Sequence, residues 1–185
     1  MEFLQQQEVG ALMQAAYEYG NQEAHLCLLV MYSSGTRVSQ ALKLKGIDII
    51  SDPSTGGQRI RIGGAKHGRT RSFRLMTSPN PAFDMTPIIE LAKSRGTSNL
   101  FGGLSRCYLH VLIKKFAALA GLHTAMVSCH RLRHSTAMRI YEKTQRIGCV
   151  SAYLCHAAPE TAYVYVAEGD SQIGDETMTA VFATA

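Results

Sequence analysis

The 185-residue sequence has no tryptophan, no long apolar run and no Cys-x2–4-Cys pair. A membrane-spanning helix needs about 18 consecutive apolar residues, and no run approaches that length, so we expect no membrane segment. The opening residues MEFLQQQEVG place no basic stretch before an apolar core, so we expect no secretory signal. The cysteines are odd in number and irregularly spaced, which predicts reduced thiols and a cytoplasmic location. They are Cys27, Cys107, Cys129, Cys149 and Cys155.

Charged residues make up only 18% of the chain, whereas hydrophobic residues make up 46%. This balance is typical of a folded globular protein and excludes a disordered or low-complexity chain. The length favours one domain over several.

Acidic residues are scarce in the middle of the chain, although the formal net charge is only +5. Residues 59–74 hold six basic residues and no acid, and residues 114–146 hold seven basic residues against the single Glu142. Such a distribution fits a surface that faces phosphate groups. It fits a solvated helix face with a charged hairpin equally well.

Hydrophobic periodicity predicts an α+β fold that is mainly helical and carries a small three-stranded antiparallel sheet. The expected strands are 46–50, 58–62 and 72–75, with a glycine-bearing hairpin turn at 63–70 between the last two. We expect Thr36 to cap a helix that begins near Arg37. The other expected helices are 4–19, 23–32, 86–95, 106–119, 130–143, 148–154, 159–166 and 171–185.

Two short segments combine residue types that suit phosphate chemistry. In SCHRLRHST, His130 and Arg133 are three residues apart, so a helix would place an imidazole and a guanidinium on one face. In YSSGTRVSQAL, Arg37 follows a Ser-Ser-Gly turn at an expected helix start. Each segment taken alone is also typical of an ordinary surface.

Two further segments could add a proton donor and a nucleophile. Lys66 lies in the expected hairpin turn, from which a lysine can reach a neighbouring groove. His156 ends one expected helix and Tyr165 lies on the next. Nearby cations would favour ionisation of a tyrosine and so activate it as a nucleophile. The alternatives are a solvated turn lysine and a core tyrosine.

The four segments, in this order, resemble the catalytic domain of the tyrosine recombinases, a family that includes the phage integrases. The resemblance lies in SSGTRVSQ, GGAKHGRTR, CHRLRHS and LCHAAPETAYVY, with Tyr165 nine residues after His156. It implies double-stranded DNA as the partner and a 3′-phosphotyrosyl intermediate, with no metal, no ATP and no other cofactor.

The resemblance also assigns a role to each matching residue. Arg37 and Arg133 would hold the non-bridging oxygens of the scissile phosphate, and Lys66 would protonate the leaving 5′-oxygen. The three other catalytic residues would be His130 as general acid and base, His156 as a phosphate ligand, and Tyr165 as the nucleophile. We further expect the DNA-contacting residues Arg69, Arg71 and Arg131.

The sequence departs from the family pattern at four places. Gln40 stands where the family usually has an acid, and Cys155 replaces the glycine before the second histidine. Ala167 replaces a common late polar residue. Tyr163 is a second tyrosine near Tyr165, but two residues along a helix turn the side chain by about 200°, so only one can face the site.

We expect residues 1–170 to form the catalytic domain and 171–185 a C-terminal helical tail. By resemblance the tail would dock on a neighbouring subunit, giving a monomer in solution that forms a tetramer on DNA. The alternative is a tail folded back on its own domain. The family's N-terminal DNA-clamping domain is either removed from this chain or never part of it.

Three other functions compete with a recombinase. A zinc protein would draw on the cysteines and histidines between Cys129 and His156, but structural zinc sites usually contain Cys-x2–4-Cys pairs. A catalytically weak DNA-binding regulator on the same fold would not need Tyr165. A topoisomerase IB-like enzyme shares the tyrosine chemistry but is usually larger. We therefore expect an enzyme for site-specific DNA strand breakage and rejoining.

Overall fold

The computed structural model describes residues 3–63 and 70–154. Within these ranges the chain forms seven α-helices, three 3-10 turns and one antiparallel sheet. The α-helices are α1 (Gln6–Glu18), α2 (Gln22–Ser34), α3 (Val38–Ala41), α4 (Pro87–Arg95), α5 (Arg106–Leu119), α6 (Cys129–Thr144) and α7 (Ile147–Leu154). The 3-10 turns are η1 (Gly46–Asp48), η2 (Pro81–Phe83) and η3 (Thr124–Met126).

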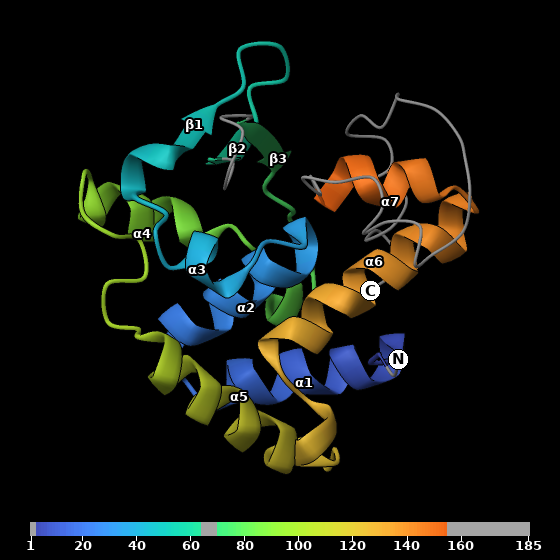
Figure 1. Cartoon of the computed structure of the whole chain (residues 1–185). Helices are drawn as coiled ribbons and strands as arrows, with labels where there is room; N and C mark the ends of the chain where they lie inside the picture. The colour runs from blue at the N-terminus through green and yellow to red at the C-terminus, as the bar shows by residue number, and fades with distance from the viewer. Residues whose placement is uncertain (1–2, 64–69, 155–185) are drawn as a thin grey trace.

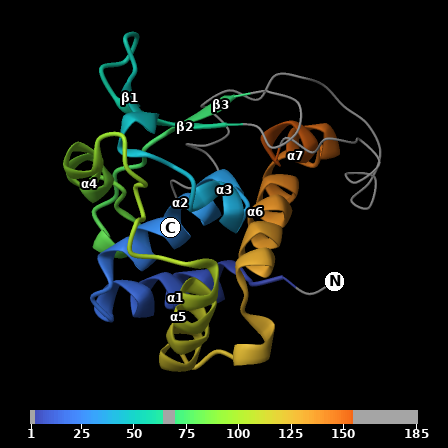
Figure 2. The ribbon, with the colours of Figure 1, turned by 60° about the vertical axis from the view of Figure 1, so that its left-hand side comes forward.

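The sheet has the strand order β1-β2-β3, formed by β1 (Ile49–Ser51), β2 (Gln58–Ile62) and β3 (Arg71–Arg74). In its register Ile60 pairs with Ile49 on one side and with Phe73 on the other. Figures 1 and 2 show the sheet at one end of the molecule, α1 and α5 at the other, and α2 between them. The predicted mainly helical α+β fold with a three-stranded antiparallel sheet is confirmed.

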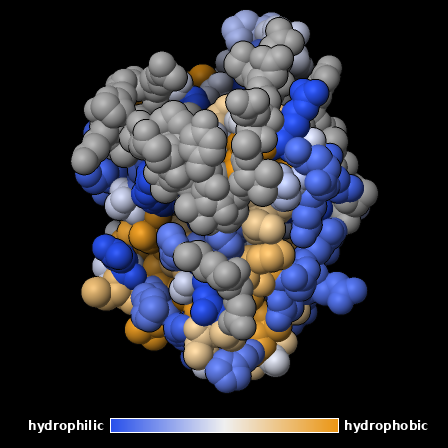
Figure 3. All heavy atoms as spheres, turned by 45° about the vertical axis from the view of Figure 1, so that its right-hand side comes forward, coloured by the Kyte–Doolittle hydropathy of each residue, from blue (hydrophilic) through white to orange (hydrophobic). Residues whose placement is uncertain are grey.

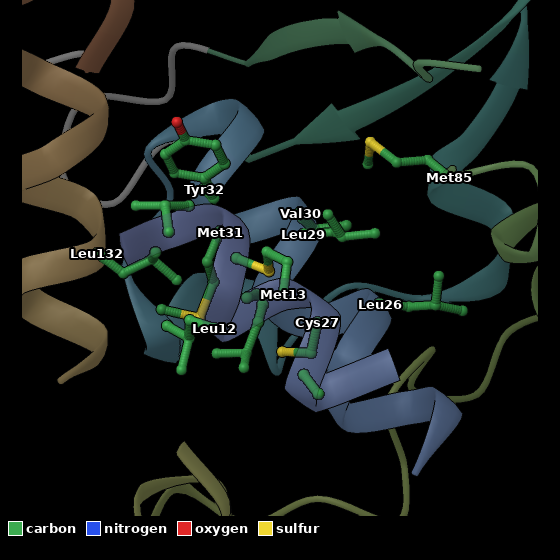
Figure 4. Packing of buried hydrophobic residues seen from close by; sticks show 14 of the residues in the cluster. Leu12, Met13, Leu26, Cys27, Leu29, Val30, Met31, Tyr32, Met85 and Leu132 are labelled. Atoms are coloured by element: carbon green, nitrogen blue, oxygen red, sulfur yellow. The ribbon is translucent and has the colours of Figure 1, made fainter. Parts of the chain in front are cut away.

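The central helix α2 is buried along its whole length from Ala24 to Ser34, which explains its nearly continuous apolar sequence. It packs against α1 and α6. Figure 4 shows side chains from these helices meeting in one cluster, with the hydroxyl oxygen of Tyr32 pointing away from it. Burying each large aliphatic side chain in such a core contributes about 1.5–3 kcal/mol, so α2 is a rigid support for the turn that follows it.

Most element ends differ from the sequence-based expectation by one or two residues, and three of the differences concern the end of α2, the start of α3 and the first strand. Helix α2 continues through Ser34 and ends at Gly35, whose φ of 60° is left-handed. Arg37, not Thr36, occupies the N-cap position of α3. The segment expected as strand 46–50 begins instead with η1, and only Ile49–Ser51 pair as β1. A Cβ built on Gly46 would overlap the Ala92 carbonyl oxygen and lie 2.7 Å from backbone atoms of Gly96, so this segment packs directly against the end of α4.

Several large apolar side chains remain exposed on the helical end of the molecule. Figure 3 shows hydrophobic residues in the lower half of one face, at the height of α1 and α5 in Figures 1 and 2. The exposed large apolar residues of these two helices and the α1 C-cap are Tyr17, Tyr19, Tyr108, Val111 and Leu119. No helix among the described residues is long and apolar enough to cross a membrane.

Candidate active site

The first turns of α6 carry the His-x-Leu-Arg-His segment. The side chain of Ser128 caps the helix by accepting a hydrogen bond from the Arg131 N–H at 3.2 Å. His130 is exposed in the first turn, whereas Arg133, one turn later, is buried at 7% exposure. The predicted helix is thus confirmed, and it presents an accessible imidazole next to a guanidinium held inside the fold.

Arg133 joins two segments that lie far from it in the sequence. One terminal nitrogen, Nη1, donates a hydrogen bond to the carbonyl of Gly35, in the turn before Arg37. The other, Nη2, donates to the carbonyl of Leu154 at 3.3 Å, at the end of α7. Three of the four segments singled out in the sequence therefore converge on one buried side chain.

Only glycine suits position 35. Its φ of 60° is a conformation that residues with a Cβ rarely adopt. A Cβ built there would also overlap the side chain of Leu154 and lie 3.5 Å from Cγ2 of Thr136. This close approach keeps the Gly35 carbonyl next to Arg133.

Arg37 is exposed directly after this turn. Its backbone N–H lies 3.4 Å from Oε1 of Gln40, and Nε2 of Gln40 donates to the Gly63 carbonyl at 3.1 Å. Gly63 follows β2 and precedes the segment that contains Lys66. An acid at position 40 could not donate to this carbonyl, so glutamine gives a link that the usual family residue lacks.

Two of the arginines expected at DNA make contacts within the chain. Arg131 is half-buried, and its Nη1 lies 2.8 Å from the sulfur of Met126. Arg71 is half-buried at the start of β3 and donates to the Tyr153 carbonyl and to Thr36. The predicted residues Lys66, Arg69, His156 and Tyr165 lie outside the described residues, as do Cys155, Tyr163, Ala167 and the helices expected at 159–166 and 171–185.

The sequence analysis missed the hydroxyl groups that fix the turn between α2 and α3. Ser34 donates to the Thr36 hydroxyl at 2.6 Å, and Thr136 donates to the Tyr32 carbonyl at 2.6 Å. The hydroxyl of Tyr153 donates to the Ser33 carbonyl. In the sequence, only the Ser-Ser-Gly-Thr string pointed to a structured turn. Thr136 and Tyr153, which bond this turn from elsewhere in the fold, lie 100 or more residues away from it.

Burial shifts the pKa values of two residues on α6, His134 and Cys129. It lowers the pKa of His134 below its usual value, and the charge of nearby His130 lowers it further, which favours the neutral imidazole. Burial raises the pKa of Cys129 to about 11, which favours the neutral thiol over the thiolate that binds zinc. No three histidine, cysteine or acidic side chains gather as a metal site in the described part of the chain.

Comparison with known proteins gives a consistent picture. The family model described as phage integrase family matches residues 2–172. The chain is 26% identical over 149 residues to the tyrosine recombinase XerD of Rickettsia conorii, which covers 74% of this chain and 49% of that protein. It is 32% identical over 147 residues to the XerD of Mycobacterium tuberculosis, covering 75% and 45%. The chain thus spans about half the length of these curated relatives.

Solved structures share the fold. A post-cleavage complex of the XerH site-specific recombinase with a palindromic difH substrate matches with a TM-score of 0.71 at 24% identity, covering 88% of this chain and 48% of that one. XerA recombinase matches with a TM-score of 0.67 at 19% identity, covering 100% and 65%. Together with the match over residues 2–172, these findings show that the chain belongs to the phage integrase family.

Proposed function

We propose that the chain is the catalytic domain of a site-specific tyrosine recombinase that cuts and rejoins double-stranded DNA. The observation that carries the proposal is Arg133, which hydrogen-bonds both the turn before Arg37 and the last residue before Cys155 and His156. A single buried guanidinium thus organises the segments that the reaction requires.

The reaction begins when the Tyr165 hydroxyl oxygen attacks the scissile phosphorus and its proton passes to His130. The bond from phosphorus to the 5′-oxygen breaks, and Lys66 gives that oxygen its proton. Arg37, Arg133 and His156 hold the phosphate oxygens, where negative charge grows in the transition state. A 5′-hydroxyl of the exchanging strand then attacks the phosphotyrosine, and the steps run in reverse.

The covalent link conserves the energy of the phosphodiester, so the cycle needs no ATP. The partner is duplex DNA, and residues 1–170 would bind it while 171–185 dock on a neighbouring subunit. In this proposal the chain is a monomer in solution, forms a tetramer on DNA and works in the cytoplasm. Support for DNA as the partner comes from solved relatives described as bound to difH and COC′ core sites.

The proposal is tested with nicked suicide duplexes made from the inverted or direct repeats that flank the gene. Cleavage beside the nick releases a short strand and traps the protein on the DNA 3′ end. We expect an adduct that survives denaturing electrophoresis on one repeat and not on a scrambled duplex. A DNA-binding regulator would form only complexes that denaturation dissolves, and a topoisomerase-like enzyme would cut both duplexes.

A further inference from the structure

Arg71 contacts two distant segments of the fold and an aromatic ring on its own strand. It is the first residue of β3, and its Nη2 donates to the Thr36 hydroxyl at 3.3 Å. Its Nη1 donates to the Tyr153 carbonyl. The guanidinium carbon lies 4.9 Å from the centre of the Phe73 ring, within the range of a cation–π contact. This planar group therefore uses both its edge and its face inside the protein.

Tyr153 completes the cluster around Arg71. Its ring is 7% exposed and meets Phe73 edge-on, with centroids 5.3 Å apart, and its hydroxyl donates to the Ser33 carbonyl. Burial raises the pKa of Tyr153, while the charge of Arg71 acts to lower it. Strand β3, the end of α2 and the end of α7 are thus held by one set of contacts.

The end of α7 is bonded by two arginines from different elements. Arg71 donates to the carbonyl of Tyr153, and Arg133 donates to that of Leu154. Together they fix the point from which the chain continues to His156.

The same contacts anchor the hairpin that bears Lys66 at both of its ends. Arg71 pairs with Ile62 where β2 and β3 meet the turn, and it ties this end to Thr36. Gly63 on the other side is bonded by Gln40. The two partners, Thr36 and Gln40, lie on either side of Arg37 in the sequence, so both described ends of the β2–β3 connection are bonded to the segment that carries Arg37.

We propose that Arg71 is a positioning residue, which ties the start of β3, just after the segment that contains Lys66, to Thr36 and to the last described turn of α7, and is not a ligand of a DNA phosphate. This replaces the DNA-contacting role expected from the sequence, and it rests on the proposed recombinase function. Lysine cannot replace it, because an ammonium group lacks the planar fork that reaches two acceptors while stacking on a ring.

The test compares Arg71→Ala and Arg71→Lys with Arg74→Ala. Arg74 lies on the same strand and is exposed, and its replacement by alanine removes the same charge. For each variant we would measure DNA affinity between 50 and 200 mM salt (roughly the range in which phosphate contacts are resolved) and the cleavage rate at saturating protein. Urea unfolding would be followed in parallel without DNA.

We expect the DNA affinity of both Arg71 variants to depend on salt as that of the wild type does. Both should cleave at least about tenfold more slowly, because general acid catalysis contributes about 10²–10⁴-fold to a rate. A DNA with a bridging 5′-phosphorothiolate, whose thiolate leaves without a proton, should recover much of the Arg71→Ala rate. A purely structural loss would not depend on the leaving group. Both variants should unfold at lower urea than Arg74→Ala.

The opposite pattern would overturn the inference. Arg71 would be a phosphate ligand if the Arg71→Ala protein cleaved normally at saturation and unfolded at the wild-type urea concentration. In that case the slope of log DNA affinity against log salt concentration would fall in magnitude by about 0.9. If the wild type itself forms no adduct, the proposed function fails. The urea comparison between the Arg71 and Arg74 variants would still test the anchoring contacts.

Discussion

The residue that most clearly links sequence to function is Arg133. The motif predicted its role, but its burial and its two carbonyl partners depend on folding, because Gly35 and Leu154 are 98 and 21 residues away. Helical spacing alone puts His130 and Arg133 on one face, and it does not say that one would be exposed and the other buried. Local patterns therefore identified the residue, and tertiary contacts define its geometry.

Replacing Arg133 with alanine should impair both cleavage and folding. We expect the cleavage rate to fall about 10²–10³-fold, as when one oxyanion donor is lost. The Gly35 and Leu154 carbonyls would lose their donor, which costs about 1–3 kcal/mol for each group left unsatisfied. Single-turnover cleavage and urea unfolding measure the two effects.

Arg37→Ala is the matched control, because Arg37 is exposed. Its cleavage rate should fall similarly, with the free energy of unfolding within about 0.5 kcal/mol of the wild type. Normal cleavage in either variant would remove that arginine from the catalytic set.

Lys66→Ala should be slow on ordinary DNA and recover on a substrate with a bridging 5′-phosphorothiolate. The thiolate leaves without a proton, so the general acid becomes dispensable. Arg69→Ala removes a cation three residues away, and its cleavage rate should show no specific recovery on this substrate. Recovery confined to Arg69→Ala would show that Arg69 is the general acid.

Among the elements, the long periodic helices and the alternating strands were predictable, and the short segments near the site were not. Helix α5 and strand β2 occur over the residues that their patterns indicate. The turn at residues 34–37 differs because the hydroxyls of Ser34 and Thr36 hydrogen-bond each other and the Gly35 carbonyl accepts a hydrogen bond from the distant Arg133. Sequence propensity favoured Thr36 as a helix cap, and these tertiary bonds outweighed it.

Gly35→Ala tests this turn as an element. The substitution would force a Cβ into left-handed backbone, at a cost of roughly 1–2 kcal/mol, and would also push against Leu154. Gly121→Ala is the control, since its φ of 70° is similar but nothing lies within 4 Å of a Cβ there. Urea unfolding should show the larger loss for Gly35→Ala, by about 1–3 kcal/mol. Cleavage should fall only in that variant, and equal effects would contradict the account.

For the whole molecule, Arg133 of α6 bonds the turn after α2 and the end of α7. Residues at the base of the β2–β3 hairpin bond the segment 36–40 and α7. The sequence predicted the fold class and the order of these parts, because both follow from local periodicity and motif order. It could not predict the contacts of Arg71, which depend on packing between distant segments. In the proposed function, several subunits assemble on DNA.

Deleting residues 171–185 tests that assembly. The tail carries Ile173, Met178, Val181 and Phe182, and burying each contributes about 1.5–3 kcal/mol, too little for a stable free tetramer. The truncated chain should fold and bind a single DNA site but lose synapsis and concerted strand exchange. Gel-shift and recombination assays report these steps. Normal recombination by the truncated chain, or an unfolded domain, would contradict docking of the tail on a neighbouring subunit.

The central claim is that Tyr165 forms a covalent bond with DNA, and adduct formation on a suicide duplex tests it most directly. Wild type and Tyr163→Phe should both be trapped on the 3′ end. Tyr165→Phe should bind the duplex with nearly unchanged affinity and form no adduct, because it lacks only the attacking oxygen. Adducts that persist in Tyr165→Phe and disappear in Tyr163→Phe would contradict the account.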